Sequence, residues 1–246
     1  MKIITFFNQK GGVGKSLLTF NIAYHFSLNY KTLIWDLDTQ KAISLFTGIT
    51  DQQKNKFDEI FKDKDKIKNH IYSTEFNNLF IIPSNDYLRN IILQLDSEKK
   101  SKKVLKKICE EIESDFDYMF IDPRPSKSLL VENIIKAADY IYIPIIPNFI
   151  NYSLIEDNID FIEYCGSKEK IMSIIFNNVD HRKKIHSEII EKVKINYKKY
   201  FIDHYIPSSS KMDEIQIRQK PVELFSKTSK ISIALKELYR IIHSKV

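Results

Sequence analysis

The sequence predicts an α/β fold: a single doubly wound, mostly parallel sheet of about seven or eight strands flanked by helices. Two observations lead to this prediction. Apolar, β-rich runs recur along the chain, and amphipathic helical patterns lie between most of them. Strands that are apolar throughout and separated by helices are typical of a parallel sheet covered on both faces. The runs are Ile3–Phe7, Thr32–Leu37, Leu79–Ile82, Tyr118–Ile121, Tyr140–Ile145, Ile171–Phe176 and Tyr200–Ile206.

Length and composition favour one domain over residues 1–246. A chain of 246 residues with 43% hydrophobic and 28% charged content can bury a sizeable core. Cys109 and Cys165 form no C-x-x-C pair, so neither a disulfide framework nor a zinc site is indicated, and a reducing cytosol is expected. No signal peptide is recognised. The longest apolar run, Tyr140–Ile146, is too short to span a bilayer.

Positive charge is concentrated in a basic C-terminal region, about residues 177–246. This region holds 15 Lys and Arg against 8 Asp and Glu, whereas the whole chain carries a net charge of +6. A polyanion partner, either nucleic acid or an anionic membrane, is the functional interpretation. The alternative is a lysine-rich surface that reflects a biased composition, since Ile, Lys and Asn are all abundant.

The first functional motif is the stretch NQKGGVGKS, residues 8–16, which lies between a strand-like run and a helical pattern over residues 16–28. Strand, glycine loop and helix form the context of a phosphate-binding loop. Glycines allow successive N–H groups to point at one oxyanion, and the helix N-terminus adds partial positive charge. Lys15 is expected to reach the β- and γ-phosphates of ATP, and the Ser16 hydroxyl to bind Mg²⁺.

This loop departs from G-x-x-x-x-G-K-[ST], because Gln9 stands where the first glycine would fall. A second lysine, Lys10, precedes Lys15 by five residues. Because Lys15 already serves its own nucleotide, Lys10 is interpreted as serving another across a subunit interface. The nucleotide-binding stretch comprises Lys10, Gly11, Gly12, Val13, Gly14, Lys15, Ser16 and Leu17.

The loop resembles the deviant Walker A motif of the ParA/MinD family of P-loop ATPases. The family's partition members, the ParA-type proteins, provide the first functional interpretation. The resemblance implies a weak ATPase that forms an ATP-sandwich homodimer and binds double-stranded DNA nonspecifically in the ATP state. It also implies hydrolysis stimulated by a ParB-like centromere-binding protein, and a cytoplasmic, nucleoid-associated location. We expect no N-terminal helix-turn-helix domain of the kind that longer relatives carry.

Carboxylates follow two of the predicted strands. Asp36 and Asp38 end the second run, at the sheet edge where ligands of parallel sheets bind. Asp38 is expected to position the attacking water. Asp36 is expected to hold a water molecule that is bound to Mg²⁺, without contacting the ion itself. Asp122 ends the Tyr118 run in a Walker B arrangement that supports the magnesium sphere. Both stretches resemble family elements, with Thr39 and Arg124 standing where prolines are usual.

The base and DNA sites rest mainly on the resemblance. Asn177 occupies the place of an asparagine that contacts the base in related ATPases, and Pro207 and Ser208 are expected to form the other wall of that pocket. Amides at strand ends are also common turn-formers. The cations expected to contact DNA phosphates are Arg182, Lys211, Arg218, Lys220, Lys227 and Lys230. A run at Lys99–Lys103 is interpreted as a solvated face, with a nucleic-acid contact as the other reading.

Other members of this fold are alternatives. A MinD-like membrane ATPase would carry an amphipathic membrane helix beyond the last core helix, whereas the apolar stripe from Ile231 to Ile242 is interpreted here as a core-docking helix. An iron–sulfur carrier or electron-transfer ATPase of the same fold would need paired cluster cysteines, and a tyrosine-kinase relative a clustered tyrosine tail. We therefore expect no membrane partner.

Overall fold

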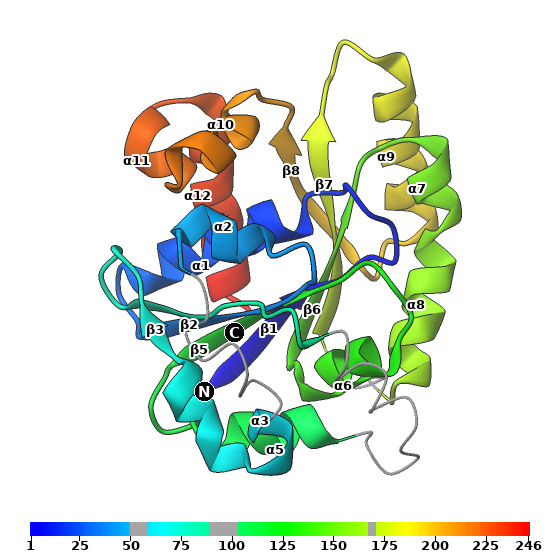
Figure 1. Ribbon diagram of the computed structural model, residues 1–246. Helices are drawn as coiled ribbons and strands as arrows, with labels where there is room; N and C mark the ends of the chain where they lie inside the picture. The colour runs from blue at the N-terminus through cyan, green and yellow to red at the C-terminus, as the bar shows by residue number, and fades with distance from the viewer. Residues whose placement is uncertain (50–58, 89–102, 167–170) are drawn as a thin grey trace.

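The structure is a computed structural model that describes residues 1–49, 59–88, 103–166 and 171–246. Its centre is an eight-stranded sheet with the order β3-β4-β2-β5-β1-β6-β7-β8 (Figure 1). Neighbouring strands are parallel, apart from the antiparallel pair of β3 and β4. The strands are β1 Lys2–Phe6, β2 Thr32–Leu37, β3 Tyr72–Ser73, β4 Leu79–Ile82, β5 Tyr118–Pro123, β6 Tyr140–Ile145, β7 Ile171–Val179 and β8 Phe201–Pro207.

The predicted fold class is thus confirmed, and each of the seven apolar runs forms a strand. The eighth strand, β3, was not predicted, because two residues are too short to show an alternating pattern. It is an edge strand that pairs with β4 alone.

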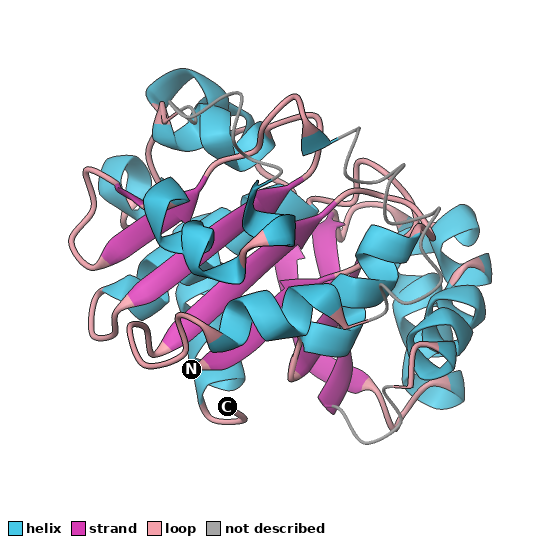
Figure 2. Cartoon of the chain, turned by 60° about the horizontal axis from the view of Figure 1, so that its bottom comes forward, coloured by secondary structure: helices cyan, strands magenta, loops and turns pink. Residues whose placement is uncertain are grey.

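Helices cover both faces of the sheet (Figure 2). One hydrophobic core lies between the sheet and the face that carries α5, α6, α8 and α9. The other lies beneath α1, α2, α10 and α12. The helices are α1 Lys15–Ser27, α2 Ala42–Thr47, α3 Glu59–Lys62, the 3₁₀ helix η1 Lys64–His70, α5 Val104–Glu110, α6 Leu129–Ala137, α7 Phe149–Ser153, α8 Ile155–Tyr164, α9 Lys184–Asn196, α10 Lys211–Arg218, α11 Val222–Ser226 and α12 Lys230–His243.

Two of these helices fix the position of the site. Helix α1 is buried over nearly its whole length and contacts α12, β2 and β5, so the loop at its N-terminus stands on a rigid support. Helix α12 buries Ile231, Leu235, Leu238 and Ile242 in the same core. The interpretation of this C-terminal stripe as a core-docking helix is therefore confirmed. Of the basic run at Lys99–Lys103, residues 99–102 lie outside the described residues.

Candidate functional site

The loop between β1 and α1 is held by two buried asparagines. The Asn8 Nδ2 donates to the Pro144 carbonyl at 2.9 Å, and its Oδ1 accepts the N–H of Lys10 at 2.8 Å. The Asn158 Oδ1, on α8, accepts the N–H of Gln9 at 2.9 Å. Both side chains are fully buried. The loop is thereby tied to β6 and α8. Asn8 lies in the predicted motif but was given no role, and Asn158 was not predicted because it lies far away in sequence.

Gly14 is required at the end of this loop for two reasons. Its φ of +92° lies in the region that L side chains rarely adopt. A Cβ at this position would also stand 2.1 Å from the Asn177 Nδ2. That amide nitrogen donates to the Val13 carbonyl at 2.8 Å. The phosphate loop and β7 therefore approach each other closely at Gly14, and Asn177 joins them.

The Lys15 side chain is buried within the loop. Its Nζ donates to the carbonyl of Lys10 at 3.1 Å. Burial lowers the pKa of this ammonium, and the negative charges of Asp122 and Asp38 oppose that shift. The lysine is thus enclosed between its own loop and two carboxylates, where a positive charge is available to a phosphate anion.

Ser16 and Asp122 meet at the start of α1. The Ser16 Oγ donates to the Asp122 Oδ2 at 2.6 Å. Asp122 is fully buried on β5, and burial together with the neighbouring Asp36 raises the pKa of its carboxyl well above the usual range. A hydroxyl and a carboxylate oxygen side by side are hard oxygen donors of the kind that Mg²⁺ prefers. These residues therefore fit a magnesium ion.

Asp36 near the end of β2 and Asp38 just after it differ in their surroundings. Asp36 is fully buried, and burial raises the pKa of its carboxyl to about 6. Its Oδ2 accepts the N–H and the hydroxyl of Ser44 at 3.0 and 2.7 Å. Asp38 is 8% exposed, and its Oδ1 accepts the N–H of Gln40 at 3.0 Å. Asp36 thus faces its own loop and α2, and its partner Ser44 was not found from the sequence.

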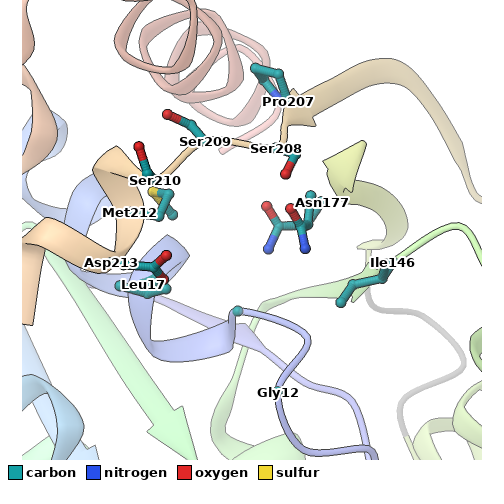
Figure 3. A pocket seen from close by; sticks show the side chains of 12 residues that line it. Gly12, Leu17, Ile146, Asn177, Pro207, Ser208, Ser209, Ser210, Met212 and Asp213 are labelled. Carbon is teal, nitrogen blue, oxygen red and sulfur yellow. The ribbon is translucent and has the colours of Figure 1, made fainter. Parts of the chain in front are cut away.

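A cavity of about 370 Å³ adjoins the loop. Figure 3 shows the Asn177 side chain between Gly12 of the loop and the Pro207–Ser208 segment, so three predicted base-site residues do line one space. One detail of the prediction is wrong: Asn177 lies within β7 and Pro207 within β8, because both strands extend further than their apolar runs. The lining residues that were not predicted are Ile146, Asn178, Ser209, Ser210, Met212 and Asp213.

Half of the six cations expected to contact DNA have an acidic partner. Glu214 on α10 forms ion pairs with Lys211 and Arg218, each at 2.7 Å. Arg182 lies in the loop before α9 and pairs with Asp180 at 2.9 Å. The remaining three are exposed and make no ion pair within the described part of the chain: Lys220, Lys227 and Lys230.

This combination of a parallel sheet, a glycine loop before a buried helix, and a serine beside a carboxylate defines a P-loop ATPase. The family model described as an AAA domain, AAA_31, matches residues 1–173. The chain belongs to this family, and the resemblance to ParA-type ATPases is confirmed.

Relatives and solved structures agree with that assignment. The chromosome-partitioning ATPase Soj of Treponema pallidum is 27% identical, covering 91% of this chain and 90% of Soj. The McdA(D38A)–ATP complex from Cyanothece superposes with a TM-score of 0.86 at 22% identity, covering 99% and 96% of the two chains. A putative plasmid partition protein of Borrelia burgdorferi, bound to AMPPNP, gives a TM-score of 0.79 at 24% identity, covering 100% and 99%.

Within the described residues, no helix has the length and apolar character needed to cross a membrane.

Proposed function

We propose that this ATPase is a DNA partition protein that binds duplex DNA without sequence preference as an ATP-bound homodimer. Hydrolysis is stimulated by a ParB-like centromere-binding partner and resets the protein to a form that releases DNA, and the protein associates with the nucleoid. The names of the Treponema Soj and Borrelia relatives support a partition role. The observation that carries the proposal is a set of exposed lysines that have no ion pair within the described residues and that follow the cavity-lining helix α10 in the chain.

The residues at the nucleotide have separate roles in this proposal. The backbone N–H groups of the loop bind the phosphates, and Lys15 places its ammonium against the β- and γ-phosphates. Ser16 and Asp122 would hold Mg²⁺, and Asp36 would hold a water molecule bound to the ion. When bound, Mg²⁺ neutralises charge that develops on the phosphates. Asp38 orients the attacking water. Asn177, Pro207 and Ser208 enclose the base. The Nδ2 of Asn177 is committed to Val13, while its Oδ1 accepts no hydrogen bond from the described residues and can accept one from the base.

Lys10 supports the dimer. Its backbone carbonyl is occupied by Lys15, while its half-buried ammonium has no carboxylate partner among the residues that the structure describes. The phosphates of one nucleotide need a single lysine from this loop. The second ammonium is therefore available to the nucleotide of a facing subunit, where two copies enclose two ATP molecules.

The DNA-binding surface begins at the nucleotide cavity. Met212 and Asp213 of α10 line the cavity. The chain then continues directly through Lys220 and Lys227, which are exposed and have no ion pair in the described residues. Exposed lysines suit phosphate contacts, which position a protein on DNA without reading its sequence. A dimer carries twice as many of these cations. Because the two sets are linked, binding of one raises the effective concentration of the other, and the affinity for DNA increases.

A mobility shift with random-sequence duplex DNA, across a salt series and with ATP or ADP, tests the proposal. Binding is expected with ATP and to be lost with ADP. The double variant Lys220→Ala/Lys227→Ala should bind more weakly and lower the salt slope by about one for each cation removed. The matched control is Lys106→Ala/Lys107→Ala, which removes two exposed lysines from α5 on the opposite face of the sheet. Equal binding in both nucleotide states, or equal loss in the control, contradicts the proposal.

A further inference from the structure

A closed ring of hydrogen bonds surrounds the loop that carries Asp38. The Asp36 Oδ2 accepts the Ser44 hydroxyl at 2.7 Å, and the Ser44 Oγ in turn accepts the N–H of Ser84 at 2.8 Å. The Ser84 hydroxyl donates to the carbonyl of Asp38 at 2.7 Å. The N–H of Asp38 then donates to the Asp36 Oδ1 at 3.2 Å, which completes the ring.

The ring joins three separate elements. Asp36 is in β2, Ser44 is in α2, and Ser84 lies just after β4, the neighbouring strand that pairs with β2 in register from Thr32 to Trp35. Both serines are buried, at 3% and 4% exposure. Ser84 is therefore anchored by a strand, and its hydroxyl reaches across to the Asp38 backbone.

The direction of each hydrogen bond is fixed by chemistry. Since the backbone N–H of Ser84 can only donate, the Ser44 Oγ accepts it and directs its own proton to the Asp36 carboxylate. The carbonyl of Asp38 can only accept, so the Ser84 proton points at it. Each hydroxyl has one possible orientation, and buried networks of this kind, when fully satisfied, hold their members rigidly.

The ring fixes the Asp38 backbone more firmly than its carboxylate. The carbonyl accepts from Ser84 and from the N–H of Lys41 at 3.0 Å, and the N–H donates to Asp36. The carboxylate accepts only one hydrogen bond that the structure describes, from the N–H of Gln40. The backbone is thus held in place while a carboxylate oxygen is left to bind another group.

We propose that Ser84 is a positioning residue for ATP hydrolysis: its hydroxyl holds the Asp38 backbone so that the carboxylate can orient the attacking water. The inference rests on the role proposed above for Asp38. The hydroxyl of Ser84 is committed to the Asp38 carbonyl and its N–H to Ser44, so we expect Ser84 to act through Asp38 and to leave the affinity for the nucleotide unchanged.

The test is steady-state ATP hydrolysis by Ser84→Ala, with ATP affinity measured separately by equilibrium binding. Because a displacement of about 1 Å at a reacting group can cost roughly a hundredfold in rate, we expect kcat to fall by roughly 10- to 100-fold. The affinity for ATP should stay within about twofold of the parent protein, which separates positioning from ground-state binding. An unchanged kcat, or an equal loss of affinity and rate, overturns the proposal.

The matched control is Ser27→Ala. Ser27 is also fully buried, and its hydroxyl also donates to a backbone carbonyl, that of Tyr24 at 2.8 Å. It lies at the far end of α1, roughly 18 Å from Lys15 by helix rise. We expect a similar loss of thermal stability in both variants, with kcat unchanged in Ser27→Ala. Comparable loss of kcat in the control would show a general structural effect and overturn the proposal.

Two further variants decide whether Ser84 acts through Asp38. Adding Ser84→Ala to Asp38→Ala should lower kcat no further, whereas independent effects would add. Ser84→Cys keeps a weak donor of similar size, so its kcat should lie between those of the parent protein and Ser84→Ala. A further loss of kcat in the double variant overturns the proposal. Where Asp38→Ala alone is inactive, Ser84→Cys decides instead, and a kcat no higher than that of Ser84→Ala overturns the proposal. Normal hydrolysis by Asp38→Ala would instead refute the proposed role of Asp38, and with it the inference.

Discussion

Replacing Gly14 with alanine tests the close approach between the phosphate loop and β7. Two separate costs are expected. At a φ of +92° an alanine is strained by about 1–2 kcal/mol. In addition, the new Cβ would stand 2.1 Å from the Asn177 Nδ2, so this side chain must move and lose its hydrogen bond to Val13. That bond contributes about 1 kcal/mol, which gives a total loss of about 2–3 kcal/mol in the free energy of unfolding.

Nucleotide binding should suffer as well, because Asn177 lines the proposed base cavity. A displaced amide both narrows the cavity and loses its orientation toward the base. We expect the dissociation constant for ATP to rise at least tenfold, which corresponds to about 1.4 kcal/mol. Equilibrium titration with a fluorescent ATP analogue measures this change, and urea unfolding measures the stability.

Gly166→Ala is the matched control for backbone strain. Gly166 has a φ of +81°, and no atom of the described residues lies within 4 Å of the position its Cβ would take. It should lose about 1–2 kcal/mol of stability from strain alone and bind ATP normally. If Gly14→Ala binds ATP within twofold of the parent protein, the contact with Asn177 does not shape the nucleotide site, and the reasoning fails.

Two predictions concern the lysines of the loop. Lys15→Ala should abolish ATP binding or hydrolysis, because the β- and γ-phosphates lose their counter-charge; steady-state turnover like that of the parent protein would refute the assignment. Lys10→Ala should leave nucleotide binding by the monomer intact but impair ATP-dependent dimerisation. Light scattering with a slowly hydrolysed ATP analogue measures the dimer, and a variant that dimerises and turns over normally would exclude a role for Lys10 across the interface.

Much of the fold was predictable because its signals are local. Runs such as Thr32–Leu37 and Tyr140–Ile145 match β2 and β6 residue for residue, since a strand buried on both faces is mostly apolar. The ends of β7 and β8 were not predictable. In β7 the polar residues Asn177 and Asn178 continue the strand beside the cavity. The apolar run therefore ends before the hydrogen bonding of the strand ends.

The residues proposed to contact DNA show the same limit. Their number and their positions can be read from the sequence. Whether a given cation forms an ion pair depends on its neighbours in space or one helical turn away. Lys211 and Arg218 share Glu214, whereas Lys220 and Lys227 have no ion pair in the described residues. A count of charges contains no information about this pairing.

The sequence by itself determined the class of fold, the phosphate loop and the carboxylates Asp36, Asp38 and Asp122. Each of these signals depends on a few consecutive residues, either the apolar pattern of a strand or the residue types of a loop. Only the tertiary structure decided which residues support them. Asn158 reaches the loop from α8, and Ser84 reaches Asp38 across 46 positions of sequence. Such contacts arise where elements distant in the chain become neighbours in the fold, and a single sequence carries no periodic signal for that pairing.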